Sequence, residues 1–184
     1  MRIISGFLKG KEIKGYTIEG TRPTMDRVKE SLFGTIQNYV KESTVLDLFA
    51  GSGNLGIEAI SNGAKYCYFV DNNIEVIKHL KKTTTNFNIS DKCQIIKNDY
   101  VQALNYFKQN CVTFDLIFVD PPYKYQIIDE IIKNIMANNL LNAGGLIILE
   151  YQDDSLEPNY QHLKLIKHKK YGNKYLSIYQ KLID

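Results

Sequence analysis

Strand-like and helical patterns alternate along most of the chain. Apolar, β-branched runs of strand length recur, and between them apolar residues recur at helical spacing. The predicted strands cover residues 44–49, 66–70, 93–97, 114–119 and 146–151, and the predicted helices cover residues 54–61, 74–87, 101–109 and 127–138. Repeated strand–helix units indicate an α/β fold with a mostly parallel sheet.

The start of the chain departs from this alternation. Residues 2–5 and 11–14 are short β-like runs separated by glycines, which predicts a small hairpin. Pro23 disfavours a helical conformation at Arg22, so an extended loop is expected there. Thr24 is then expected to cap a helix that runs to about residue 40.

The end of the chain departs from it as well. Residues 163–169 and 174–181 are predicted strands, and the Tyr171-Gly172-Asn173 segment between them is typical of a hairpin turn. The sheet is therefore expected to end in an antiparallel hairpin.

Two helix boundaries carry sequence signals. Gly63 follows the predicted helix 54–61, where a glycine commonly ends a helix. Asn72 precedes the predicted helix 74–87 and Glu75 follows three residues later, close to a capping box.

Length and composition restrict the class of protein. The 184 residues correspond to about one domain, and 44% hydrophobic and 23% charged residues are ordinary for a globular chain. No apolar run has the length of a membrane span, and the start lacks a signal-peptide pattern. Three cysteines without a C-x-x-C pair argue against disulfides or zinc. We expect a cytoplasmic monomer without a metal and without a membrane partner.

Charge is distributed unevenly. The net charge of +3 combines +4 in residues 1–29, −6 in residues 30–160 and +5 in residues 161–184. A basic surface is typical of a protein that binds a polyanion, but surface lysines that merely collect near the termini would give the same totals. Charge alone leaves both interpretations open.

A glycine-rich loop follows the first predicted strand. Gly51, Gly53 and Gly56 match G-x-G-x-x-G, and Asp71 follows twenty residues after Gly51, as in a dinucleotide-binding loop. Asp47 at the strand–loop junction would repel a pyrophosphate, which disfavours a nicotinamide dehydrogenase. S-adenosylmethionine has no phosphate and carries a cationic amine and sulfonium, so it fits this loop better.

Three acidic residues stand at successive strand ends, where open α/β sheets bind ligands. Asp47 can accept a hydrogen bond from the cofactor's amino group, and Asp71 can accept both ribose hydroxyls. Asp99 can accept the adenine amine or can simply cap the helix that follows, and the sequence leaves both open. Gly51 and Gly53 allow the backbone to approach the cofactor closely.

The tetrad Asp120-Pro121-Pro122-Tyr123 ends the fourth predicted strand. The prolines hold the backbone rigid, so that the Asp120 carboxylate and the Pro121 carbonyl can accept both hydrogens of a planar exocyclic amine. This would aim the nitrogen lone pair at the sulfonium methyl group. Tyr123 can stack on the base.

Several segments together resemble the RsmD family of ribosomal RNA methyltransferases. They are Arg2-Ile3-Ile4-Ser5-Gly6, Thr21-Arg22-Pro23-Thr24, Leu46-Asp47-Leu48-Phe49-Ala50-Gly51-Ser52-Gly53 and Leu55-Gly56-Ile57-Glu58-Ala59. The resemblance spans nearly the whole chain and is weakest in the tail. Asn62 stands where the family usually has arginine.

The resemblance implies a fold, a reaction and a set of residues. The fold would be a class I, Rossmann-like three-layer sandwich with seven strands. The reaction would methylate the N2 amine of a guanine in 16S ribosomal RNA, within an assembling small subunit, and would release S-adenosylhomocysteine. Residues 44–184 would form the catalytic core, to which Phe49, Asn72 and Thr24 add cofactor contacts.

We expect the two basic ends of the chain to meet on the cleft side and to bind the flanking RNA, with residues 1–40 as an RNA-binding extension. The candidate RNA contacts are Arg22, Arg27, Lys9, Lys11, Lys169 and Lys170. Arg22 and Thr24 could instead reach the methionine carboxylate of the cofactor.

Other functions stay open at this point. The tetrad suits an amine of DNA adenine or cytosine, or a protein glutamine amide, equally well. A catalytically inactive assembly factor is a further alternative, against which the intact glycine loop and tetrad argue.

Overall fold

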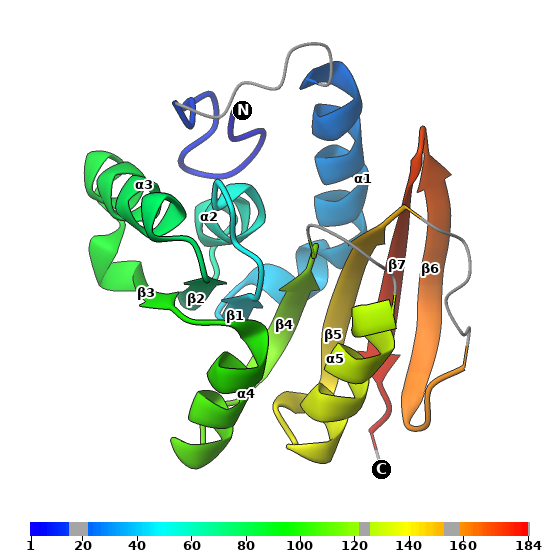
Figure 1. The fold of residues 1–184 in the computed structure, drawn as a ribbon. Coiled ribbons are helices and arrows are strands. Elements are labelled where there is room, and N and C mark those ends of the chain that lie inside the picture. Colours follow the sequence, from blue (N-terminus) through cyan, green and yellow to red (C-terminus); the bar gives the residue numbers. More distant parts are fainter. Residues whose placement is uncertain (15–21, 122–125, 153–158, 184) are drawn as a thin grey trace.

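Seven strands form one sheet in the computed structural model, which describes residues 1–14, 22–121, 126–152 and 159–183, with 22–25 and 126 as backbone only. The strand order is β3-β2-β1-β4-β5-β7-β6 (Figure 1). Pairing is parallel from β3 through β5 and antiparallel between β5, β7 and β6. The strands are β1 (Thr44–Asp47), β2 (Tyr66–Asp71), β3 (Cys93–Lys97), β4 (Phe114–Val119), β5 (Leu141–Tyr151), β6 (Leu163–Tyr171) and β7 (Lys174–Lys181).

Helices cover both faces of the sheet, which gives three layers (Figure 1). One apolar core joins the sheet to the first three helices, and a second joins its other face to the last two. The helices are α1 (Arg22–Val40), α2 (Asn54–Ser61), α3 (Ile74–Asn86), α4 (Tyr100–Gln109) and α5 (Gln126–Ala137), with a short 3-10 turn, η1 (Ser90–Lys92). The predicted α/β architecture with its antiparallel hairpin is confirmed.

Several predicted boundaries differ from the observed ones, and three of them have a clear structural reason. Helix α1 begins at Arg22 rather than after Thr24, because the first turn of a helix tolerates the missing amide of Pro23. The cap of α3 is Asn73 rather than Asn72, and its side chain accepts a hydrogen bond from the Glu75 amide at 2.9 Å. Strand β5 begins at Leu141, which lies opposite Phe114 across a register shift.

The predicted N-terminal hairpin is reduced to a single antiparallel bridge between Arg2 and Glu12. The Ile3 amide donates to Lys11 O at 2.9 Å, and Ile3 is fully buried. The loop that follows lies on the C-terminal end of α2, where the Phe7 amide donates to Ser61 O at 2.9 Å. This segment is therefore held both by backbone hydrogen bonds between its two runs, among them Gly10 N to Ile3 O and Ile13 N to Met1 O at 2.8 Å, and by its contact with α2.

A buried ion pair joins this segment and α1 to α2. Lys29 and Glu58 are 3% and 0% exposed, and Lys29 Nζ lies 2.8 Å from Glu58 Oε2. The same ammonium donates to Asn54 Oδ1 at 2.8 Å and to Arg2 O at 2.6 Å. Glu58 also accepts the amide of Ser5 at 2.8 Å. Three separate segments thus share one fully hydrogen-bonded charge pair.

None of the helices in the described ranges is long and apolar enough to cross a membrane.

The contact between Gly6 and α2 predicts a strong substitution effect. Gly6 has φ 75°, and a Cβ atom there would lie 1.8 Å from the carbonyl oxygen of Ser61. We expect Gly6→Ala to lower the free energy of unfolding by more than about 1 kcal/mol, since backbone must move as well as adopt a strained conformation.

Gly10→Ala is the matched control in the same loop. Gly10 has φ 87°, but an added Cβ meets nothing within 4 Å. Urea denaturation should therefore show a smaller loss for Gly10→Ala than for Gly6→Ala. Equal losses would mean that the close approach to Ser61 contributes nothing.

Candidate active site

The carboxyl ends of four parallel strands bring four acidic residues to one edge of the sheet. Asp47 and Asp71 are the last residues of β1 and β2, Asp99 follows β3, and Asp120 follows β4. Asp47 pairs in register with Phe69 on one side and with Phe118 on the other. The predicted convergence of these acids is the result of strand order alone, because parallel strands end at the same edge.

The glycine loop connects β1 to α2 at this edge and is hydrogen-bonded to β2. The amide of Gly51 donates to Asp71 Oδ2 at 3.0 Å, and the amide of Ala50 donates to Val70 O at 2.9 Å. Gly51 has φ 50°, and a Cβ atom on it would meet nothing closer than 4.0 Å. The loop therefore leaves open space directly above its backbone, where a ligand can approach.

The other two glycines serve packing. A Cβ atom on Gly53 would lie 2.5 Å from Leu80 Cδ2, and one on Gly56 would lie 2.3 Å from the ring of Phe69. Gly56 thereby lets α2 lie directly on β2. Close helix–strand packing is also the role of the last glycine in dinucleotide-binding loops, so the spacing alone does not identify the cofactor.

Asp47 is buried beneath this loop, 4% exposed, and its Oδ2 accepts the amide of Gly56 at 3.0 Å. Desolvation raises the pKa of Asp47 to about 7, against the opposing hydrogen bond from Gly56 and with a further contribution from Asp71. A buried acid with this pKa is costly to the fold and suits a cationic ligand.

Asp71 and Asp99 are held by backbone amides. Asp71 Oδ1 accepts from the Asn73 amide at 2.9 Å, in addition to its bond from Gly51. Asp99 Oδ1 accepts from the Gln102 amide at 2.9 Å and caps α4. The capping interpretation of Asp99 is thus confirmed, and it leaves a second carboxylate oxygen for a ligand.

Two apolar side chains beside these acids, Ile74 and Val101, were not predicted from the sequence, whereas Phe49 was predicted as a cofactor contact. Ile74 and Val101, at the starts of α3 and α4, are 47% and 43% exposed. Phe49 is half-buried, and its ring lies 5.9 Å from that of Tyr100. Exposed apolar residues two or three positions after a strand-end acid are the signal that could have revealed this flank for a flat group.

Asp120 is half-buried at the end of β4. Burial raises its pKa to about 7, with Glu150 and Asp47 raising it further and Lys174 lowering it. Pro121 is half-buried next to it, whereas Pro122 and Tyr123 lie outside the described residues. Glu150, near the end of β5, pairs with Lys174 of the tail hairpin.

The tail hairpin meets α1 close to this edge (Figure 1). Tyr171 Oη lies 2.5 Å from Ser31 Oγ, and Lys167 Nζ donates to Thr35 Oγ1 at 2.7 Å. Lys169 and Lys170 are exposed on β6, each with its ammonium 5.1 Å from a tyrosine ring centre.

The basic residues near the N-terminus lie in two places. Arg27 is exposed on α1, while the side chains of Arg22 and Thr24 lie outside the described part of the structure. Lys9 lines a groove between the N-terminal segment and α1, and Lys11 lies 5.2 Å from the ring centre of Phe87.

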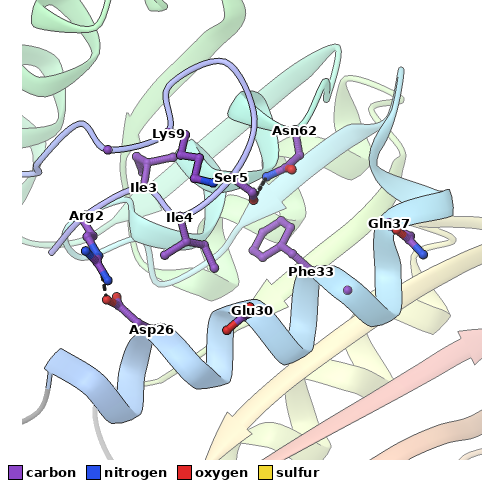
Figure 2. Close-up of a pocket in the computed structure, with 12 residues that line it drawn as sticks. Arg2, Ile3, Ile4, Ser5, Lys9, Asp26, Glu30, Phe33, Gln37 and Asn62 are labelled. Atoms are coloured by element: carbon purple, nitrogen blue, oxygen red, sulfur yellow. Dashed lines mark hydrogen bonds and ion pairs between the residues drawn. The ribbon is translucent and has the colours of Figure 1, made fainter.

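That groove does not include the four acids. Figure 2 shows Arg2 bonded to Asp26 across it, with Nε and Oδ2 2.9 Å apart. Phe33, Glu30 and Asn62 also line it. Its opposite charges neutralise each other, so it offers no strong site for an ion.

Among the described residues, no group of three or more His, Cys, Asp and Glu side chains could hold a metal ion. Asn72 is exposed directly after Asp71, within reach of the same edge.

Comparison with known proteins agrees with this geometry. The model of the family described as conserved hypothetical protein 95 matches residues 1–180. Ribosomal RNA small subunit methyltransferase D of Haemophilus influenzae is 35% identical over 182 residues, which is 98% of this chain and 93% of that protein. The chain belongs to the RsmD family.

Solved structures agree in fold. A Haemophilus influenzae protein described as a "putative methylase" is 32% identical, with a TM-score of 0.81 over 99% of this chain and 98% of that one. The structure of SMU.776, described as "a putative methyltransferase complexed with SAH", is 14% identical, with a TM-score of 0.67 over 80% of this chain and 49% of that one. The fold of the RsmD chain is that of S-adenosylmethionine-dependent methyltransferases.

The site of this RsmD protein fits that cofactor. The open space above Gly51 admits a ligand that touches backbone, and buried Asp47 offers a carboxylate to a cation. The adjacent exposed faces of Ile74 and Val101 suit a flat apolar ring.

Burial of Asp47 predicts that the stability of the protein depends on pH. Its pKa of about 7 lies above the ordinary value of 3.8, so the folded state binds this proton more tightly than the unfolded state. The free energy of unfolding should therefore fall as pH rises from about 4 to 7. Asp47→Asn should remove that part of the slope and stabilise the protein at pH 8 by up to about 4 kcal/mol.

Thermal or urea unfolding of both proteins across pH 4–8 measures this difference. Glu75→Gln, which alters an exposed acid of α3, is the control and should leave the slope unchanged. A slope for Asp47→Asn equal to that of the unaltered protein would show that Asp47 is not protonated on folding.

Proposed function

We propose that this protein transfers a methyl group from S-adenosylmethionine to the exocyclic N2 amine of a guanine in 16S ribosomal RNA. The observation that carries the proposal is that Asp47, Asp71 and Asp120 lie at the carboxyl edge of the parallel strands, where the loop at Gly51 leaves open space above its backbone. The choice of RNA is supported by the Haemophilus influenzae relative, which is named ribosomal RNA small subunit methyltransferase D. The guanine N2 position is our extension of that name.

Each of these residues would bind a different part of the cofactor. Asp47 would accept from its amino group and Asp71 from the ribose hydroxyls. The second oxygen of Asp99 would accept from the adenine amine, between the exposed faces of Ile74 and Val101. Phe49, Asn72 and Thr24 would complete the contacts.

Asp120 would hold the amine that reacts. Its carboxylate and the Pro121 carbonyl would accept the two amine hydrogens, which aims the nitrogen lone pair. The cofactor supplies a methyl group on a positively charged sulfur. As the nitrogen forms its bond to that carbon, the carbon–sulfur bond breaks and the amine becomes acidic. A carboxylate with a pKa of about 7 is a suitable acceptor for the proton released at neutral pH.

The RNA would lie across α1 and the tail hairpin. Exposed Arg27 on α1 and Lys169 and Lys170 on β6 flank the place where Tyr171 meets Ser31. Tyr123 would stack on the flipped guanine, and Arg22 would extend this basic surface. Residues 1–40 would thus act as an RNA-binding extension of the 44–184 core, with Lys9 and Lys11 reaching RNA farther along α2. We infer that the protein acts as a monomer on an assembling small subunit.

Asp120→Ala tests the chemistry. The variant should bind S-adenosylhomocysteine normally but lose at least about 100-fold in methyl transfer, since the amine is no longer positioned. Transfer of labelled methyl groups to small-subunit RNA from a deletion strain, followed by mapping of the modified nucleotide, measures both rate and target.

Asp71→Ala is the complementary variant and should lose cofactor affinity first. Transfer within a few-fold of normal for Asp120→Ala would contradict the role of Asp120. A label found on DNA adenine or on a protein glutamine instead of RNA would favour those substrates.

Arg27→Ala tests the RNA surface. If Arg27 contacts a phosphate, the variant should bind RNA more weakly, and the slope of log affinity against log salt should flatten by about one. Filter binding at several salt concentrations measures both quantities, and cofactor affinity should not change.

Lys133→Ala is the matched control, because Lys133 is exposed on α5 across the sheet. It should leave the salt slope as it is. An unchanged slope for Arg27→Ala would show that Arg27 does not contact an RNA phosphate.

A further inference from the structure

Four charged side chains form a row on one face of the sheet at its carboxyl edge. Asp47 ends β1, Asp120 follows β4, Glu150 lies near the end of β5, and Lys174 begins β7. Val119 pairs in register with Leu149, so Asp120 and Glu150 are the next residues of adjacent parallel strands and share a face. Glu150 pairs with Leu176, and Lys174 lies two residues away on the same face.

Lys174 is bonded within this row. Its Nζ donates to Glu150 Oε1, and the two side chains are 37% and 18% exposed. Although burial lowers the pKa of Lys174, the carboxylates of Asp120 and Glu150 raise it above its ordinary value. The ammonium therefore stays charged beside Asp120.

Asp120 is surrounded mostly by negative charge. Glu150 on β5 and Asp47 on β1 both disfavour its carboxylate form, and Lys174 on β7 favours it. From α1, which covers this face of the sheet, the buried charge among the described residues is Lys29, and that ammonium is bonded to Glu58. Lys174 is thus the cation that acts on Asp120 within the described site.

The proposed reaction uses Asp120 in its charged form, because a carboxylate can accept the proton that the amine releases, whereas a carboxyl that is already protonated cannot. We propose that Lys174, fixed by Glu150, is a positioning residue for methyl transfer that favours the ionised form of Asp120. This inference rests on the proposed function and adds a residue to it. It assigns a part of the site to the tail hairpin, where a lysine would otherwise serve solubility or RNA binding.

The test uses two variants with opposite expected effects. Lys174→Met removes the favourable charge and should move the titration midpoint of the Asp120 carboxyl upward by about one pH unit or more. Glu150→Gln removes a repelling charge and should move it downward. Lys174→Arg keeps the charge and should restore a midpoint near that of the unaltered protein.

Carbon-detected NMR titration of the full-length protein measures these midpoints without any substrate, with Asp120→Asn used to assign the signal. The acid limb of kcat against pH should shift in the same direction and by a similar amount for each variant. Lys164→Met, at the far end of the same hairpin, is the charge-matched control and should change neither measurement.

The outcomes separate this inference from the proposed function. Midpoints that do not move, or that move in one direction for both variants, would overturn it, as would moved midpoints with an unmoved acid limb. A Lys174→Met variant that loses RNA affinity with an unchanged Asp120 midpoint would make Lys174 a phosphate contact instead. If the unaltered protein methylates no RNA while the midpoints shift as expected, the proposed function fails and the charge coupling stands.

Discussion

The buried ion pair between Lys29 and Glu58 is the interaction on which the arrangement of α1, the N-terminal segment and α2 depends. It gathers α1, the first five residues and the start of α2 around one ammonium and one carboxylate. Such a pair stabilises little in itself, because desolvation offsets the attraction, but removing one partner leaves a buried charge alone. Its effect is to fix geometry: α2 carries the glycine loop, and α1 carries the basic surface. The relative placement of these two parts is set at this bond.

Burial in the same low-polarity interior makes the charged forms of the acids at the carboxyl edge of the sheet energetically unfavourable. Asp47 and Asp120 both have pKa values raised to about 7, because burial penalises their charged forms. The fold gives up stability to hold carboxylates there, which is the pattern expected of a site that binds a cation and handles a proton. In the loop above them, by contrast, the backbone amides are hydrogen-bonded to Asp71 and to β2.

The local sequence pattern was sufficient to predict the helices, the strands and the acids at the strand ends. Helix α2 and strands β3, β4 and β7 have the predicted bounds, and strand order brings Asp47, Asp71, Asp99 and Asp120 to one edge. The start of β5 was missed because Asn142-Ala143-Gly144-Gly145 has the composition of a turn, and pairing with β4 overrides it. Contacts between distant segments left no local signal. Lys29 meets Glu58 over 29 positions, and Lys174 meets Glu150 over 24.

The position of β7 has a consequence for the order of assembly. In the described sheet β6 pairs with β7 and has no other partner, while β7 lies between β5 and β6. A ribosome makes β6 first, so the emerging chain must hold β6 and the free edge of β5 unpaired until β7 follows. Completion of the sheet is then a late, long-range step that follows the local strand–helix units. Since Lys174 arrives with β7, a partly synthesised chain would have the glycine loop and Asp120 in place and still lack the cation beside them.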